Sequence, residues 1–324
     1  MTKNAVPWAY VCVFIGVTGH ASSEFFAVLS GIKGAEVSVW RYLVGSAGLL
    51  LVALARPATR DLITPLRERG LRIVLLSLFG MGMGQLFFHW SLDFATVTQV
   101  ATMVTTMPIL VVILDHLIHK GPISTPKMIS GLGAFGGVVL LLTDGYLGDG
   151  YLGNSYLSGL GGAGATLPGL ILALGCAVVG AFYMVLMRPV IREYGAIRII
   201  TLTFTIGAVG LWLVVGAAWG IWVDPTTLFE RPPKAYLSVL TLGFWNTTIA
   251  MVLWLGGLAA VPDMGRANYL FFFKPVIAAG LAFFILRQEI TAIQILAIAA
   301  ITLCVSVEVF YDRIKAALAR RPAA

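Results

Sequence analysis

The stretch FFKPVIAAGL, Phe272–Leu281, sets a lysine and a proline inside an apolar run that extends from about Met264 to Leu286. A helix needs about 20 apolar residues to cross a bilayer, and this run has that length. Lys274 lies near its middle, where a charged side chain costs about 3 kcal/mol or more. The stretch therefore predicts a membrane-spanning helix whose lysine faces a cavity or a partner rather than lipid.

The composition of the whole chain is that of a membrane protein. Of its 324 residues, 59% are hydrophobic and 11% are charged, and the mean hydropathy is +0.91. Soluble domains carry about 25% charged residues, so this chain cannot bury its apolar side chains in one water-soluble core. The net charge of +7 is then no sign of nucleic-acid binding, and the lipid bilayer is the partner that the composition predicts.

Ten apolar segments of sufficient length follow one another along the chain. They cover approximately residues 8–28, 37–55, 71–92, 97–118, 126–143, 167–187, 197–219, 236–257, 264–286 and 291–311. With a cytoplasmic N-terminus and alternating crossings, 16 lysines and arginines fall inside, 5 fall outside, and Lys274 stays in the membrane. The positive-inside rule requires this kind of asymmetry, so we expect both termini to be cytoplasmic.

Two passages of the first half recur in the second half at a nearly constant spacing. GSAGLLLV, Gly45–Val52, resembles GAVGLWLV, Gly207–Val214, which comes 162 residues later. TTMPILVVIL, Thr105–Leu114, resembles the opening stretch, with Pro108 matching Pro275. Five spans per half is an odd number, so the second copy enters the membrane from the opposite side. The predicted fold is therefore an all-α integral membrane protein with ten transmembrane helices in two inverted five-helix repeats, as is typical of secondary transporters.

The domain boundaries follow from this repeat. Residues 1–143 are the predicted first five-helix repeat, and residues 167–324 are the second, which ends in a basic cytoplasmic tail. Residues 144–166 are rich in Gly, Ser and Tyr and contain no basic residue. This composition indicates a flexible extracytoplasmic linker.

Three passages carry a resemblance to a known family. Arg41 opens the second span in VWRYLVGSAGLLLVAL, the third and fourth spans join as HWSLDFATVTQVATMVTTMPILVVIL, and the ninth and tenth read GRANYLFFFKPVIAAGLAFFILRQEITAIQILAI. Over nearly its whole length the chain is similar to the EamA-type ten-helix permeases of the drug/metabolite transporter superfamily. The resemblance implies export or exchange of amino acids, other metabolites or drugs without ATP, in the cytoplasmic (inner) membrane of a prokaryote. It names no particular cargo.

Polar side chains stand in several other predicted spans, where they are expected to face a cavity or a partner. His20 and Glu24 are four residues apart, as are Gln85 and His89, so each pair shares one helix face. The further candidates for binding a small-molecule substrate are Trp90, Trp245, Asn246, Tyr269 and Tyr183. With Lys274, these residues form the predicted substrate site.

Two roles are open for Lys274. It binds the carboxylate or another anionic group of a substrate, or it is the counter-ion of Glu24. In the second role, protonation of Glu24 or His20 couples export to proton entry. Both roles fit one mechanism, because substrate and proton would compete for the same charges. An ion pair between Glu24 and Arg41 near the outer mouth is the structural alternative.

Other site classes are weaker. His20, His89 and Glu24 lack the ligand spacing of a metal site on one element, and no cofactor is predicted. Cys12, Cys176 and Cys304 lie inside apolar segments and resemble small buried hydrophobes. The histidines also fit buried residues satisfied by neighbours, and amides such as Asn246 could hydrogen-bond between helices.

The predicted function is secondary active transport, by export or exchange, of amino acids or other carboxylate-bearing metabolites. No serine–histidine–aspartate order, carboxylate pair or metal motif supports an enzyme, so no catalytic residue is proposed. A multidrug or lipophilic amine exporter of the same fold is the alternative, although Lys274 would repel a cationic cargo. A channel is a further alternative, without a filter-like stretch to support it. The sequence leaves open a monomer or a homodimer.

Overall fold

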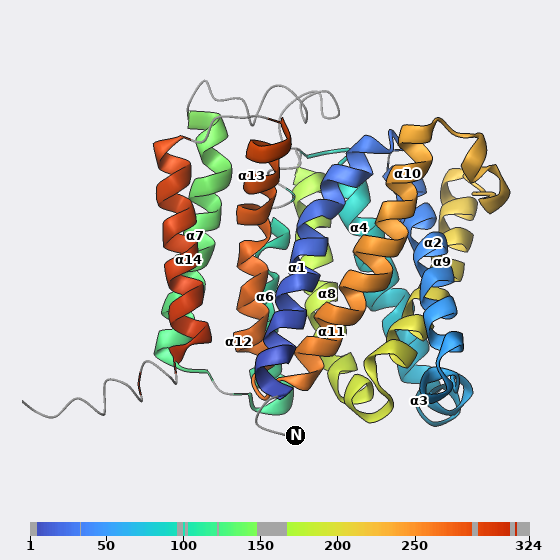
Figure 1. The fold of residues 1–324 in the computed structure, drawn as a ribbon, viewed down its shortest axis with the longest axis horizontal. Coiled ribbons are helices and arrows are strands. Elements are labelled where there is room, and N and C mark those ends of the chain that lie inside the picture. The colour runs from blue at the N-terminus through green and yellow to red at the C-terminus, as the bar shows by residue number, and fades with distance from the viewer. Residues whose placement is uncertain are drawn as a thin grey trace, which may run out of the picture.

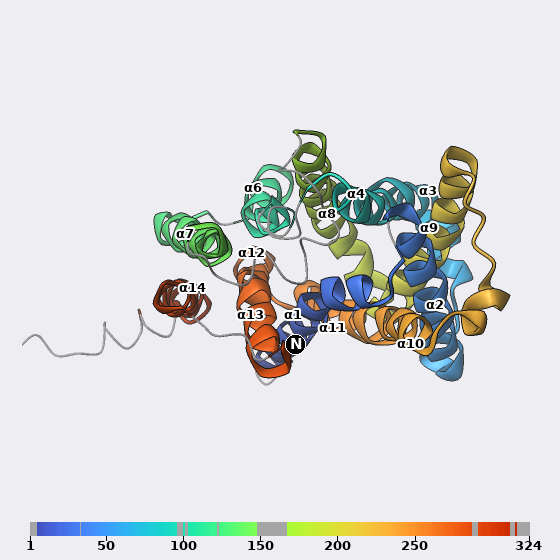
Figure 2. The ribbon, with the colours of Figure 1, turned by 90° about the horizontal axis from the view of Figure 1, so that it is seen from above.

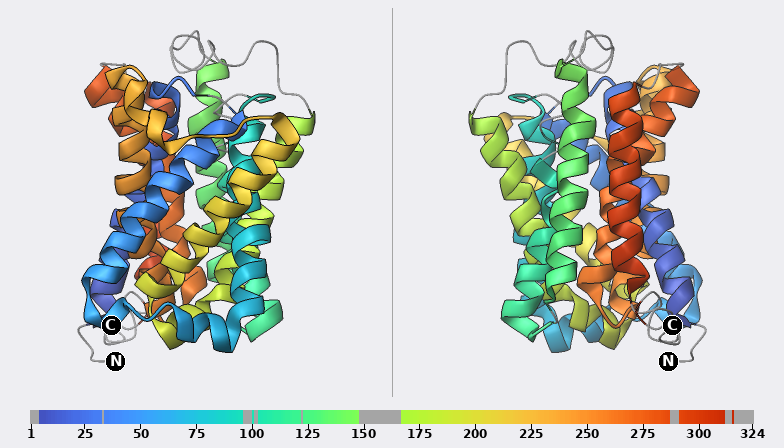
Figure 3. Two further views of the ribbon diagram at one scale, coloured as in Figure 1. Left: turned by 90° about the vertical axis from the view of Figure 1, so that its right-hand side faces the viewer. Right: turned by 90° about the vertical axis from the view of Figure 1, so that its left-hand side faces the viewer.

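The computed structural model describes residues 5–32, 34–95, 100, 103–121, 123–147, 167–286, 291–311 and 315. In this part of the chain the regular structure is entirely helical, and most helices run along one common direction (Figure 1, Figure 3). Six helical runs among these residues are long and apolar enough to cross a membrane: Gly34–Ala55, Pro57–Ser91, Leu167–Tyr194, Ala196–Trp219, Pro233–Ala260 and Ala292–Val309.

The helices follow the apolar segments of the sequence. The first half contains α1 (Ala5–Leu29), α2 (Gly34–Ala55), η1 (Pro57–Thr59), α3 (Ile63–Leu75), η2 (Leu76–Gly82), α4 (Met83–Ser91), α6 (Met107–His119) and α7 (Thr125–Leu147). The second half contains α8 (Leu167–Tyr194), α9 (Ala196–Trp219), η3 (Pro225–Glu230), α10 (Pro233–Thr241), η4 (Leu242–Ile249), α11 (Ala250–Ala260), α12 (Met264–Asn268), η5 (Tyr269–Phe272), α13 (Phe273–Leu286) and α14 (Ala292–Val309). The linker expected over residues 144–166 lies outside the described residues beyond the end of α7.

Helix irregularities fall at corresponding places in the two halves. The third and eighth expected spans each contain a π-helix, η2 between α3 and α4 and η4 between α10 and α11. Pro108 is the second residue of α6, and Pro275 is the third residue of α13. A proline is tolerated in the first turn because its missing N–H has no intrahelical partner there. The matched prolines therefore begin new helices after a turn and after the 3₁₀ segment η5, respectively.

Close helix crossings hold the centre of the bundle together. Helix α1 packs along α11, α2 along α9, and α4 along α8, whereas α7 and α14 form a pair at one end of the molecule (Figure 2). A Cβ atom on Gly16 of α1 would lie 2.5 Å from Trp254 Cβ and 2.8 Å from the carbonyl oxygen of Ala250. Glycine at this position therefore permits the contact between α1 and α11.

We expect Gly16→Ala to destabilise the protein by about 1–3 kcal/mol, because the added methyl group overpacks this crossing. The measurement is the thermal unfolding midpoint of the purified protein in detergent. Gly136→Ala in α7 is the matched control, because a Cβ there meets nothing within 4 Å. The control gains about 1 kcal/mol of helix propensity at most. Equal midpoints for the two variants would contradict the close crossing.

Candidate substrate-binding site

A cavity of about 70 Å³ lies at the centre of the bundle. Its lining comes from both halves: α1, α2, η2, α4 and α6 in the first, and α8, α11, η5 and α13 in the second. The polar side chains of the lining are His20, Ser23, Arg41, Gln85 and Lys274. Buried polar groups that converge on one cavity are the usual mark of a ligand site.

Lys274 is the second residue of α13 and is 6% exposed. Its Nζ atom lies 5.4 Å from the ring centre of Phe88 and 5.7 Å from that of Phe271. Both distances are within the range of cation–π contacts. The lysine predicted to face a cavity does so, and aromatic faces flank its ammonium group.

Arg41 contributes a second cation to the same cavity. It lies in α2, is 2% exposed, and donates from Nε to Thr247 Oγ1 at 3.0 Å. Thr247 belongs to the π-helix η4, and its hydroxyl donates to the carbonyl of Leu242 at 2.9 Å. The hydroxyl is therefore oriented to accept from Arg41. The π-helix thus helps to set the plane of the guanidinium group.

His20 lies on the cavity wall in α1 and is 8% exposed. Its ring packs edge-to-face on Trp254, with 4.5 Å between ring centres. The Nε2 atom is buried and has no hydrogen-bond partner among the described residues. A buried ring nitrogen without a partner is costly, so a ligand or a water molecule is the expected partner.

Gln85 and His89 are four residues apart on α4, as expected, but only Gln85 lines the cavity. The Gln85 amide nitrogen lies 3.2 Å from His89 Nδ1, and Ser38 Oγ lies 2.6 Å from the same ring nitrogen. His89 therefore stands behind Gln85 and orients its amide. Within the described residues, no group of three His, Cys, Asp or Glu side chains could hold a metal ion.

Trp245 and Asn246 do not line the cavity. Trp245 Nε1 donates to Ser22 Oγ at 3.1 Å, and Asn246 Nδ2 donates to the same oxygen at 2.9 Å. Asn246 also donates to the carbonyl of Gly19 at 2.5 Å. These contacts tie η4 to α1, which agrees with the alternative reading of Asn246 as an interhelical hydrogen-bonding residue.

The predicted Tyr183, Tyr269 and Trp90 also lie outside the cavity lining. The Tyr183 hydroxyl donates to Thr203 Oγ1 at 3.0 Å, and the Tyr269 hydroxyl donates to the carbonyl of Lys127 at 2.6 Å. Trp90 is partly buried and packs edge-to-face on Trp219, with 5.0 Å between ring centres. Each ring therefore has a packing or hydrogen-bonding partner away from Lys274.

Glu24 belongs to α1 by its backbone, but its side chain lies outside the described part of the structure. The predicted contacts of Glu24 with Lys274 or Arg41 therefore stay predictions.

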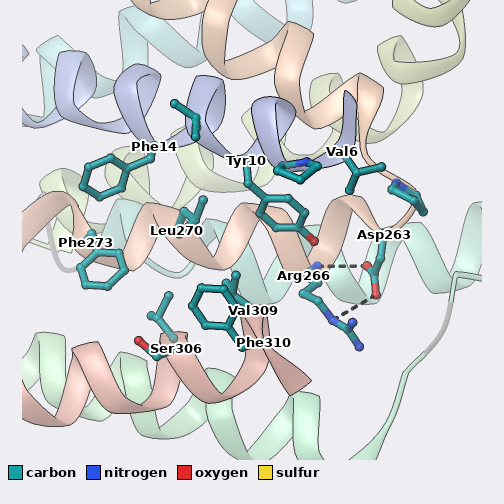
Figure 4. A pocket seen from close by; sticks show the side chains of 14 residues that line it. Val6, Tyr10, Phe14, Asp263, Arg266, Leu270, Phe273, Ser306, Val309 and Phe310 are labelled. Atoms are coloured by element: carbon teal, nitrogen blue, oxygen red, sulfur yellow. Dashed lines mark hydrogen bonds and ion pairs between the residues drawn. The ribbon is translucent and has the colours of Figure 1, made fainter. Parts of the chain in front are cut away.

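A second, larger hollow of about 620 Å³ opens between α1, α14 and the continuous run of α12, η5 and α13 (Figure 4). Its walls include Phe14, Leu270 and Phe273, and only the end at Asp263 and Arg266 is charged. Asp263 Oδ1 accepts from the backbone N–H of Arg266 at 3.0 Å, and the Arg266 Nε atom lies 4.0 Å from Asp263 Oδ2. The hollow therefore has an apolar body, and the Lys274 cavity remains the better candidate for a polar cargo.

Comparison with protein families agrees with this architecture, because one family model matches each half of the chain separately. The model of the EamA-like transporter family matches residues 6–143 and matches again at residues 167–308. The chain belongs to the EamA-like transporter family. It is a multi-pass membrane transporter with two EamA domains, and the resemblance found in the sequence is confirmed. The family is normally non-enzymatic.

Individual relatives of this EamA transporter are distant. The uncharacterized transporter YyaM of Bacillus subtilis (strain 168) is 24% identical over 274 residues, which cover 84% of this chain and 82% of the relative. An uncharacterized transporter of Clostridium kluyveri is 20% identical over 285 residues, or 87% and 86% of the two chains. A crystal structure with 17% identity aligns with a TM-score of 0.75, covering 94% of this chain and 97% of its own. This chain and the crystal structure therefore share a fold. The names of the relatives identify no transported substrate.

Proposed function

We propose that this EamA transporter is a secondary active carrier, an exporter or exchanger, for amino acids or other small carboxylate-bearing metabolites. The observation that carries the proposal is the pair of buried cations, Arg41 and Lys274, on the wall of one central cavity. Arginine and lysine side chains bind carboxylates through charge-assisted hydrogen bonds. The bacterial relatives suit a carrier of the cytoplasmic (inner) membrane.

Alternating access is the mechanism that suits this chain. Ten crossings in two inverted five-helix repeats, with both termini cytoplasmic, would put the cavity between the repeats. The paired π-helices η2 and η4 support the repeat, as do the helix starts at Pro108 and Pro275. Discontinuous helices at a central site are typical of secondary transporters.

Proton coupling is part of the proposal. His20 lies on the cavity wall, its buried Nε2 atom has no hydrogen-bond partner among the described residues, and Glu24 follows one helical turn later. Proton uptake by either residue would change the charge that faces Arg41 and Lys274. Cargo and proton would then compete for the site, which is the simplest form of antiport.

Reconstitution into proteoliposomes tests the proposal. A thermal-stabilisation screen against amino acids, other carboxylates and amines first selects a cargo, and counterflow of that cargo is then measured. We expect saturable counterflow without ATP, stimulated by a proton gradient. Flux that never saturates would indicate a channel instead. Selective counterflow of lipophilic amines would favour the drug-exporter alternative, which the two buried cations oppose.

A further inference from the structure

Methionine is concentrated on the wall of the central cavity. Four of the chain's 10 methionines line it: Met81 of η2, Met107 of α6, Met184 of α8 and Met251 of α11. Each is at most 9% exposed, and each half contributes two. The rest of the apolar wall includes the aromatic rings of Phe88, Trp254 and Phe271.

The size of the cavity requires its wall to move. Its volume of about 70 Å³ is well below the roughly 300 Å³ at the lower end of small-molecule pockets, so a carboxylate with an apolar body needs the wall to move outward. An unbranched methionine has three rotatable bonds and re-packs around different shapes at little cost. Gly80, Gly84 and Gly180 lie on the same wall, and a Cβ atom on Gly180 would lie 2.8 Å from Met107 Cε, so the end of the Met107 side chain packs where a glycine leaves space.

The two cationic side chains of the wall are held in place more firmly than the methionines. The hydrogen bond from Nε to Thr247 orients the guanidinium of Arg41, and that planar group presents several further N–H donors. The ammonium of Lys274 makes cation–π contacts with the rings of both Phe88 and Phe271. Among the described lining residues, these two carry positive charge and none is acidic.

We infer that the carrier selects its cargo by an anionic head group and accepts apolar bodies of different shapes. This inference rests on the proposed function and narrows it: the cargo class is small amphipathic carboxylates. Arg41 and Lys274 hold the head group, and the four methionines adapt to the body. Adaptable methionine surfaces bind varied apolar partners in other proteins by the same physics.

Cys176 provides a binding probe, because its side chain lies on the same wall. Replacing Cys12 and Cys304 by alanine leaves Cys176 as the single thiol. The rate of its reaction with N-ethylmaleimide is measured against hexanoate, 4-methylpentanoate and 3-phenylpropanoate, and against hexanamide and hexylamine. We expect the three acids to protect within about fivefold of one another. The amide and the amine should protect at least about 20-fold more weakly, because they lack the charge that the cations bind.

The methionine wall is tested by Met184→Ile combined with Met251→Ile in the single-thiol protein. Isoleucine is branched at Cβ and stiff. We therefore expect the difference in Cys176 protection between the best and the worst of the three acids to widen beyond about tenfold. Met187→Ile is the matched control, because Met187 is fully buried in α8 and lies off the cavity. In the Met187→Ile variant, the three acids should differ in Cys176 protection by the same factor as in the single-thiol parent.

Several results would overturn the inference. A tenfold preference among the acids in the parent would contradict the adaptable wall, and so would an unchanged spread in the double isoleucine variant. Protection by hexylamine equal to that by hexanoate would contradict the anionic head. Ligand-induced thermal stabilisation with the same probes must give the same ranking. Protection without counterflow contradicts only the proposed transport, whereas counterflow without protection or stabilisation contradicts only this inference.

Discussion

Substrate exchange is expected to be abolished when Lys274 is replaced by methionine. Lys274 is 6% exposed and lines the cavity beside Arg41. Methionine keeps the length and helix propensity of the side chain but removes its charge and all three N–H donors. Losing a buried charge that binds a carboxylate costs about 3 kcal/mol, which is about a hundredfold in affinity. The measurement is the initial rate of counterflow in proteoliposomes.

Lys234→Met is the matched control for this variant. Lys234 is exposed in the first turn of α10 and lies off the cavity, so its replacement should leave exchange unchanged. Removing a charge from a membrane-buried position should not unfold the protein, and an unchanged thermal midpoint of Lys274→Met would exclude misfolding. Exchange at the parent rate in Lys274→Met would refute the role assigned to this lysine.

The sequence predicts the centre of this site for a physical reason. A charged or strongly polar side chain in an apolar segment has few stable positions, because contact with lipid is costly. Lys274, His20 and Gln85 were expected to face a cavity on that ground, and all three line one. Their functional roles stay predictions.

Arg41 is the residue that sequence reasoning assigned differently. The second span was expected to begin near residue 37, which put Arg41 outside, near the mouth. Helix α2 begins at Gly34 instead, so Arg41 lies seven residues into the helix, roughly 10 Å along its axis. It is buried on the cavity wall. The charge asymmetry alone could not reveal this, because moving one arginine hardly alters a count of 16 against 5.

Side-chain partners across helices could not be predicted either. Asn246 and Ser22 are 224 positions apart, and their contact depends on how η4 crosses α1. A methionine in an apolar segment gives no signal at all, because lipid, core and cavity all accept it. For the same reason Tyr183 and Tyr269 could not be separated from true lining residues before their hydroxyl partners were located.

The ion pair between Lys127 and Asp263 supplies the second large effect. Lys127 Nζ lies 2.8 Å from Asp263 Oδ2 and 3.0 Å from Oδ1, and the lysine side chain is 4% exposed. The pair joins α7 of the first half to the start of α12 in the second, at the end of the bundle where the N-terminus lies (Figure 1). We expect Asp263→Asn to destabilise the protein by about 3 kcal/mol, because the buried ammonium of Lys127 loses the carboxylate charge that it contacts.

Asp224→Asn is the control for the loss of a helix cap. Asp224 and Asp263 both accept a backbone N–H at the start of a helical segment, but Asp224 is exposed and forms no ion pair with any of the described residues. Asparagine is as good a cap as aspartate, so the Asp224 variant should unfold at the parent temperature. A similar midpoint for both variants would show that the Lys127 pair contributes little.

The double variant Lys127→Met with Asp263→Asn separates stability from gating. Removing both charges leaves no buried ion uncompensated, so most of the lost thermal stability should return. If the Lys127–Asp263 pair also holds this end of the transport path closed, the double variant populates the closed conformation less. If cargo binds that conformation, the apparent affinity of the double variant for cargo falls in proportion to its population. We therefore expect parent-like stability with a raised KM in counterflow. An unchanged KM would show that the pair stabilises the fold without controlling transport. Its loss would then change the equilibrium between folded and unfolded protein, but not the equilibrium between open and closed conformations.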